Sequence, residues 1–182
     1  MNFTSYERFG VNFVALAVTP ERIRSAVMEA AGRPLQIGPM PAGPGGLASV
    51  TAKGHVGLVD VEKLEGHDLR FLATLPIDLD LEIKLAGVPQ RYKGDIEVRL
   101  SLSVKTAEPL WLVIDVAPVG NEDVTVSLTP EGVAAEMLQR VGNMDEEVRS
   151  QVIRTVNERI NSEAARATRQ IDVAGLIDGA LA

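Results

Sequence analysis

The sequence predicts an α+β fold, in which a long, coiled antiparallel sheet of about six to seven strands packs on a long C-terminal helix. Apolar residues occupy alternate positions in several consecutive segments, which is typical of strands. Short turns join these segments, as in an antiparallel meander. The last segment changes to helical periodicity. Since 182 residues suffice for one sizeable core, we expect a single domain over residues 1–182.

Composition excludes several classes of function. The net charge of -7 and the two Tyr, four Phe and one Trp residues argue against nucleic-acid binding, because phosphates are repelled and stacking platforms are scarce. The absence of cysteine excludes disulfides, thiolate nucleophiles and zinc–sulfur sites. The N-terminal residues lack the basic and apolar regions of a signal peptide, and no apolar run reaches the length of a membrane span. We therefore expect a soluble, cytoplasmic protein.

The N-terminal part predicts one strand, one short helix and a loop. Alternating apolar residues over Phe9–Val18 indicate a strand with a shift of phase, as a bulge would produce. Thr19-Pro20-Glu21 carries a helix N-cap, a proline at the first position and an acid in the first turn, and Gly32 ends the helix. Residues 33–46 are rich in proline and glycine and are expected to form a loop.

The middle of the chain predicts the longest strands. Leu47–Val61 alternates, with glycines that indicate a bend or bulge. In Leu69–Leu85 every odd position is apolar. Such a strand would extend about 58 Å if straight, whereas a compact globule of this length is about 40 Å across. We therefore expect the strand to coil strongly or to break at Pro76.

A connection and three further strands follow. Residues Gly87–Gly94 are expected to connect two strands and to carry a basic and aromatic cluster of Arg91, Tyr92 and Lys93. This cluster suits either a lipid headgroup, which would give a peripheral membrane contact, or an ordinary solvated loop. Alternation then predicts strands at Ile96–Val104, Leu110–Val116 and Val124–Leu128.

The C-terminal part predicts helices. Thr129-Pro130-Glu131 repeats the earlier helix start, and a helix is expected from residue 130 to Val141. A second helix over Asp145–Gln170 would be about 39 Å long. Small residues in its second half allow either close packing on the sheet or space for a ligand. Asp172 is expected to cap a last helical turn.

No group of residues predicts catalysis or metal binding. Asp78, Asp80 and Glu82 share one strand face, which favours a solvated surface paired with cations on neighbouring strands over a metal site. His55 and His67 lie in different elements and match no catalytic triad. We therefore expect no enzymatic activity, no metal and no cofactor.

The segment from Leu69 to the C-terminus carries a pattern found in a known family. It has long alternating strands, then PLWLVIDVAPVGNEDVTVSL, then helical sequence ending in VIRTVNERINSEAARATRQIDV. This pattern resembles the tubular lipid-binding (TULIP) superfamily of bacterial type, whose members coil a long antiparallel sheet around a long helix. Many bacterial members are exported, whereas this sequence shows no export signal. The order of elements also resembles the helix-grip (START or Bet v 1-like) fold.

The TULIP resemblance implies non-enzymatic binding or carrying of a lipid or other apolar small molecule between the sheet and the long helix. Two alternatives stay open: a structural or protein-interaction module that forms a homodimer, and a helix-grip ligand-binding protein. The residues that would line the ligand groove are Leu79, Leu81, Ile83, Leu85, Val98, Leu100, Leu102, Leu112, Ile114, Val152 and Val156.

Overall fold

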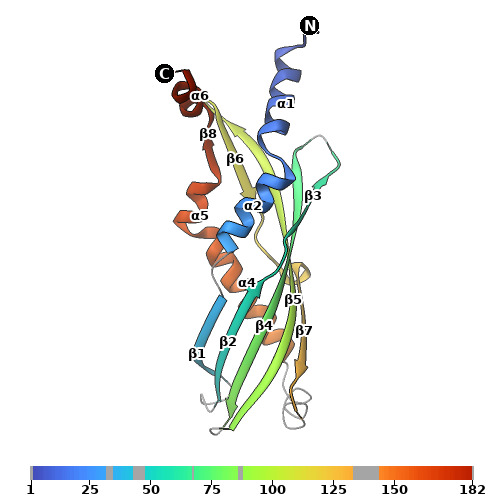
Figure 1. Ribbon diagram of the computed structural model, residues 1–182, viewed down its shortest axis with the longest axis vertical. Helices are drawn as coiled ribbons and strands as arrows, with labels where there is room; N and C mark the ends of the chain where they lie inside the picture. The colour runs from blue at the N-terminus through green and yellow to red at the C-terminus, as the bar shows by residue number, and fades with distance from the viewer. Residues whose placement is uncertain are drawn as a thin grey trace.

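The computed structural model describes residues 2–31, 35–42, 48–66, 68–85, 88–132 and 144–181, and the molecule is elongated (Figure 1). Within these residues the helices are α1 (Tyr6–Ala17), α2 (Pro20–Ala31), η2 (Asn121–Asp123), α4 (Met144–Asn161), α5 (Glu163–Thr168) and α6 (Val173–Leu181). The strands are β1 (Leu35–Ala42), β2 (Ala48–Val56), β3 (Asp60–Leu64), β4 (Arg70–Leu85), β5 (Val88–Ala107), β6 (Trp111–Val116), β7 (Val124–Pro130) and β8 (Gln170–Asp172). The predicted α+β class with a curled antiparallel sheet is therefore confirmed.

The sheet consists of two halves that share the long strands β4 and β5. Its order is β1-β2-β4-β5-β6-β8, with β3 pairing on β4 and β7 pairing on β5. One half contains β1, β2 and β7, of which β2 and β7 pair with β4 and β5, respectively, toward the end where Leu85 pairs with Val88. The other half contains β3, β6 and β8 at the opposite end (Figure 1). Helix α4 packs chiefly on β7 and helix α2 on β3.

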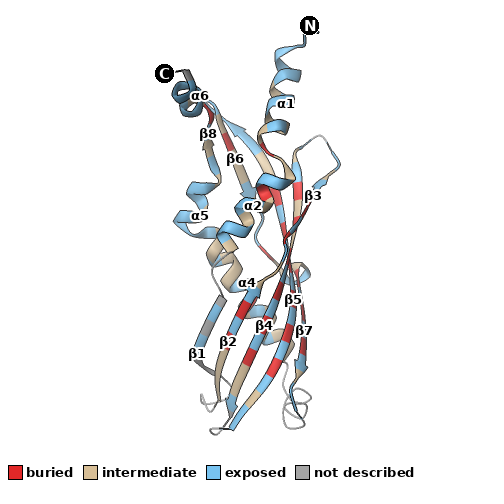
Figure 2. Ribbon diagram, viewed as in Figure 1, coloured by how far each residue is buried: buried red, intermediate tan, exposed pale blue. Residues whose placement is uncertain are grey.

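The alternation predicted for β4 is confirmed residue by residue. Its odd-numbered side chains from Phe71 to Leu81 are buried, and the even-numbered side chains of β5 from Tyr92 to Leu102 face the same side (Figure 2). Antiparallel pairing of Phe71 with Leu102 and of Leu79 with Gly94 brings the two apolar stripes into register. One face of the sheet is thereby apolar along its length.

Strand β4 does not break at Pro76, contrary to one of the two expected outcomes. Pro76 lies opposite a bulge between β2 and β3, where the backbone amide of Gly57 donates to the Pro76 carbonyl at 2.8 Å. The missing N–H of proline faces the same side as this carbonyl, where the ladder is already interrupted. The strand also has no need to fit a 40 Å globule, because the molecule is elongated (Figure 1).

The connection predicted at Gly87–Gly94 is wrong, because β5 begins at Val88 and extends over 20 residues. Tyr92 is buried on the inner face, and Arg91 and Lys93 point outward to carboxylates on β4. The basic and aromatic cluster is therefore split between two faces of a strand. Because this segment contains several polar residues, the alternation of buried and exposed positions in Ile96–Val104 was not recognised as beginning earlier in the chain.

The strand predicted at Phe9–Val18 is also wrong, because these residues belong largely to α1. The Ser5 side chain caps this helix by accepting from the Arg8 amide at 3.2 Å, and Glu7 lies in the first turn. The change of phase in the apolar pattern, which was interpreted as a bulge, reflects the helical spacing of these residues in α1. Helix α2 is confirmed, but it follows a helix rather than a strand.

The loop predicted at residues 33–46 contains the edge strand β1. Two prolines are tolerated there because an edge strand has one unpaired side, and the register shifts between Ile37 and Met40. Residues 32–34 and 43–47 lie outside the described residues.

The single long helix predicted for Asp145–Gln170 is wrong. Helix α4 ends at Asn161, Ser162 caps the short α5, and β8 begins at Gln170. The Ser162 hydroxyl accepts from the Ala165 amide, a local bond that favours a new helix start over continuation. The start predicted at residue 130 is wrong because β7 includes Pro130, and residues 133–141 of that helix lie outside the described residues.

Candidate functional site

The inner face of the sheet gathers the residues predicted to line a groove into one apolar cluster. Seven of them are buried and three are half-buried. The side chain of Leu85 lies outside the described residues, although its backbone ends β4. The buried residues are Leu79, Leu81, Val98, Leu100, Leu102, Leu112 and Val152, and the half-buried residues are Ile83, Ile114 and Val156. Their role as ligand contacts stays a prediction.

Helix α4 lies along this cluster but buries little of itself. Val152, with 9% of its surface exposed, is its one buried residue. The other apolar residues of its inner stripe are only half-buried: Val148, Ile153, Val156 and Ile160. A helix that fills a groove completely would bury such a stripe. Half-buried apolar side chains therefore line one side of the inner face.

Polar contacts hold α4 in place. The Asn157 side chain accepts from the Val119 amide at 2.9 Å and donates to the Val119 carbonyl at 3.0 Å. Arg149 donates to the Val124 carbonyl at 3.2 Å and to Glu146 at 2.5 Å. The bonds to Val119 and Val124 fix the helix to the segment before β7 and to the first residue of that strand, so its position does not depend on apolar burial alone.

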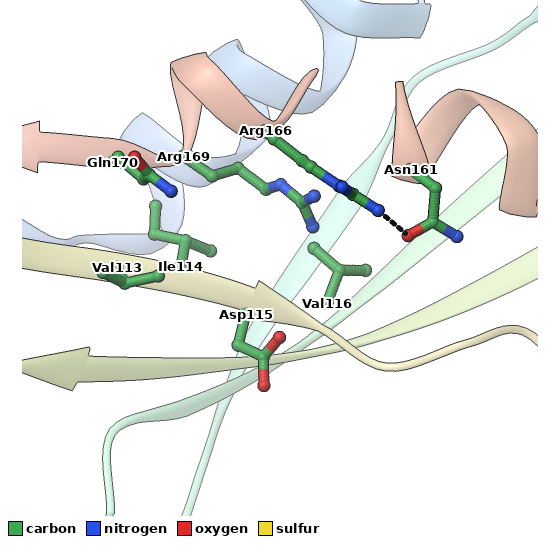
Figure 3. Close-up of a pocket in the computed structure, with 8 residues that line it drawn as sticks. All are labelled: Val113, Ile114, Asp115, Val116, Asn161, Arg166, Arg169 and Gln170. Atoms are coloured by element: carbon green, nitrogen blue, oxygen red, sulfur yellow. Dashed lines mark hydrogen bonds between the residues drawn. The ribbon is translucent and has the colours of Figure 1, made fainter. Parts of the chain in front are cut away.

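A pocket of about 240 Å³ lies where α4 and α5 meet β6 and β8 (Figure 3). It is partly open to solvent and continuous with the cluster through Ile114 and Val116. It lies beside the end of the pairing between β8 and β6, which covers Trp111–Val113 and is followed by a bond from the Ile114 amide to the Arg169 carbonyl at 2.9 Å. The lining residues are Val113, Ile114, Asp115, Val116, Asn161, Arg166, Arg169 and Gln170.

The pocket carries positive charge. Arg169 donates to the carbonyls of Ala165 at 3.0 Å and Ile160 at 2.7 Å, which holds its guanidinium at the helix break. Arg166 donates to Asn161 at 3.4 Å and is otherwise exposed. Figure 3 shows Asp115 pointing away from both guanidinium groups.

Asp115 does not neutralise this charge fully. Lys105 donates to its carboxylate at 2.6 Å, and this hydrogen bond holds the pKa of Asp115 below its ordinary value, with Arg169 adding a smaller effect in the same direction. With Asp115 already paired, the two arginines leave the pocket suited to an anionic group.

The three carboxylates on β4 form a solvated outer face. Lys93 pairs with Asp80, and this bond lowers the pKa of Asp80, while Arg91 lies 3.5 Å from Glu82. Within the described residues no group of acidic residues or histidines is arranged to hold a metal ion. His55 lies opposite Asp78 on the same face, and His67 lies outside the described residues.

Comparison with known proteins does not extend this description: no family model matches the chain, and no curated protein matches it. Among the described helices, none has both the length and the apolar character needed to cross a membrane.

Sequence reasoning missed the arginine pocket. In a single helix over Asp145–Gln170, Arg166 and Arg169 would lie near the C-terminal end, where the helix dipole favours cations. The available signal was Asn161-Ser162, an N-cap residue after an amide in the middle of the supposed helix. A break there places both arginines beside β6.

Proposed function

We propose that this protein binds an amphiphile whose apolar chain lies along the inner face of the sheet beside α4, as the TULIP resemblance led us to expect. The carrying observation is the row of half-buried apolar side chains along the margins of this face. On the strands these are Val50, Val56, Ile83, Val104, Ile114, Val116 and Ile171. Apolar groups left half in water gain free energy when a lipid chain covers them, about 25 cal/mol per Å².

The pocket supports a ligand with an anionic end. Ile114 and Val116 belong both to the apolar cluster and to the pocket lining, so the two regions adjoin. A carboxylate or phosphate there would accept charge-assisted hydrogen bonds from Arg166. The pocket volume of about 240 Å³ is small for a whole ligand and suits a headgroup.

Native mass spectrometry of gently purified protein tests the proposal directly. We expect an additional mass that organic extraction removes, and saturable displacement of a fluorescent fatty acid by palmitate. The same spectrum reports oligomeric state. A chain that carries no additional mass and binds no fatty acid would contradict the proposal, and an obligate dimer would favour the homodimer alternative.

Substitutions separate the two parts of the site. Ile83→Asp places a charge among the half-buried side chains of the apolar cluster, away from the pocket, so it should reduce palmitate binding at least tenfold, whereas Val88→Asp at an exposed position should not. Arg166→Ala should weaken palmitate binding roughly two- to fivefold. It should leave the uncharged hexadecanol unaffected, and equal loss for both ligands would exclude a headgroup role.

A further inference from the structure

Exposed apolar side chains collect at one end of the molecule. This end comprises α1, α6 and the turn between β5 and β6, and both chain termini lie there (Figures 1 and 2). The Val173 amide at the start of α6 donates to the Leu110 carbonyl, which ties α6 to this turn. The exposed large apolar residues of this end are Phe3, Tyr6, Phe9, Val11, Phe13, Leu16, Leu110, Leu176 and Ile177. Elsewhere in the described residues the large exposed ones are Met28, Leu58 and Val88.

Helix α1 presents most of this surface on one side. Tyr6, Phe9, Phe13 and Leu16 follow helical spacing and share a face. Tyr6 is 97% exposed and Phe9 60%, and α1 buries none of its residues. The helix projects away from the sheet (Figure 1). An exposed apolar face of this kind is typical of a site that contacts a membrane or another protein.

The area favours a lipid surface over a second copy of the chain. Each aromatic side chain contributes about 150–250 Å² when fully buried, so the face offers on the order of 500 Å². A stable dimer buries about 800 Å² on each partner. Helices α1 and α6 also stand apart as two projections (Figure 1). A fluid lipid surface can accept both without matching their shape, whereas a rigid partner must match their arrangement.

Charge selects the kind of lipid surface. Glu7 and Arg8 are the charged residues of α1, and their charges cancel. The chain as a whole carries a net charge of -7, which opposes contact with anionic lipids. The buried apolar and aromatic area must then supply the binding energy.

We propose that α1 docks this end of the molecule on a zwitterionic lipid bilayer. The side chains of Tyr6, Phe9, Phe13 and Leu16 lie among the upper acyl chains. Helix α6 and Leu110 make a second contact beside it. This docking does not depend on the ligand proposed for the inner face, since α1 lies outside that cluster apart from its end.

Vesicle flotation with the full chain tests the docking. We expect wild type to float with phosphatidylcholine vesicles, with little effect of salt, and to bind phosphatidylglycerol vesicles less. Tyr6→Ser and Phe9→Ser should each weaken binding about tenfold, since each removes one aromatic group from the interface. Both positions are exposed, so the fold should persist. Leu58→Ser and Val88→Ser remove exposed apolar groups elsewhere and should leave binding unchanged.

Three outcomes overturn the proposal. The first is wild-type protein that does not float with phosphatidylcholine vesicles. The second is an equal loss of flotation in the Leu58→Ser and Val88→Ser controls. The third is a dimer, seen by light scattering, that Tyr6→Ser dissociates while flotation is absent, because α1 would then bind a second copy. Loss of fatty-acid binding by the inner face would leave this test unaffected, so the two proposals fail separately.

Discussion

Helix α1 and strand β4 are both strongly apolar on one face, yet only β4 buries that face. The odd-numbered residues of β4 are covered by the curled sheet and by its neighbours in one cluster. The aromatic face of α1 remains exposed. An apolar face is therefore buried only where the topology places other elements of the chain against it. Strand β4 lies inside the sheet, between β2 and β3 on one side and β5 on the other, whereas α1 projects from the end of the molecule.

The largest expected effect compares two phenylalanines. Phe71 on β4 is fully buried, so Phe71→Ala should lower the free energy of unfolding by about 3–5 kcal/mol. Phe9→Ala on α1 should change it by less than about 0.5 kcal/mol. Urea unfolding followed by circular dichroism measures both. Comparable losses would mean that α1 packs on the domain in solution, which would break the comparison.

Two glycines sharpen the comparison. A Cβ at Gly94 on β5 would lie 2.9 Å from Leu128 Cδ2 and 3.2 Å from Leu79 Cβ, so Gly94→Ala should destabilise by about 1–3 kcal/mol. A Cβ at Gly10 meets nothing within 4 Å, and alanine favours helix. Gly10→Ala should therefore raise helicity without loss of stability. If Gly10→Ala lowered the free energy of unfolding, α1 would have to be in contact with another group at Gly10 in solution.

Helix α4 provides the contrast of a helix that is tied down. Asn157→Ala removes both hydrogen bonds to the Val119 backbone and should cost about 1–3 kcal/mol. It should also speed amide hydrogen exchange in α4 more than in β4. The exposed Arg154→Ala is the matched control on the same helix. An Asn157→Ala variant as stable as this control would show that apolar packing alone holds α4.

The smallest effect concerns the outer face of the sheet. The pKa of Asp115 is lowered from 3.8 by its bond to Lys105, so the unfolded chain binds this proton more readily than the folded chain. The pair therefore stabilises the fold above about pH 4, and this contribution is lost as pH falls through the folded pKa. For so exposed a pair it is below about 1 kcal/mol. Asp115→Asn should flatten the loss of stability between pH 5 and pH 3 slightly, and added salt should do the same.

Much of the sheet could be predicted from sequence because two-residue periodicity survives wherever one face is buried. The inner residues of β4 and the alternation from Ile96 onward were predicted in this way. Tyr92 was missed because the polar residues around it resemble a turn. The identity of α1 was missed because a ten-residue apolar segment fits either period until a partner strand is known.

The candidate site divides along the same line. The apolar lining follows from local periodicity, so its residues could be named in advance. The pocket with Arg166 and Arg169 could not, because it depends on the helix break at Ser162 and on where the short β8 meets β6. The helix break has a local signal at Asn161-Ser162, but the pairing of β8 with β6 is a contact between distant segments, which local periodicity does not encode.

The interruptions in the sheet have a consequence for how this chain can change in length. Segments 58–59 and 118–123 leave the ladder, and the strands beside them resume pairing on the far side. Extra residues accepted there would leave every side chain on its present face. The uninterrupted strands β4 and β5 cannot accept such a change. The gain or loss of a single residue would move every following side chain of the strand to the opposite face of the sheet. Length variation among evolved forms should therefore fall at these two segments and spare the central strands.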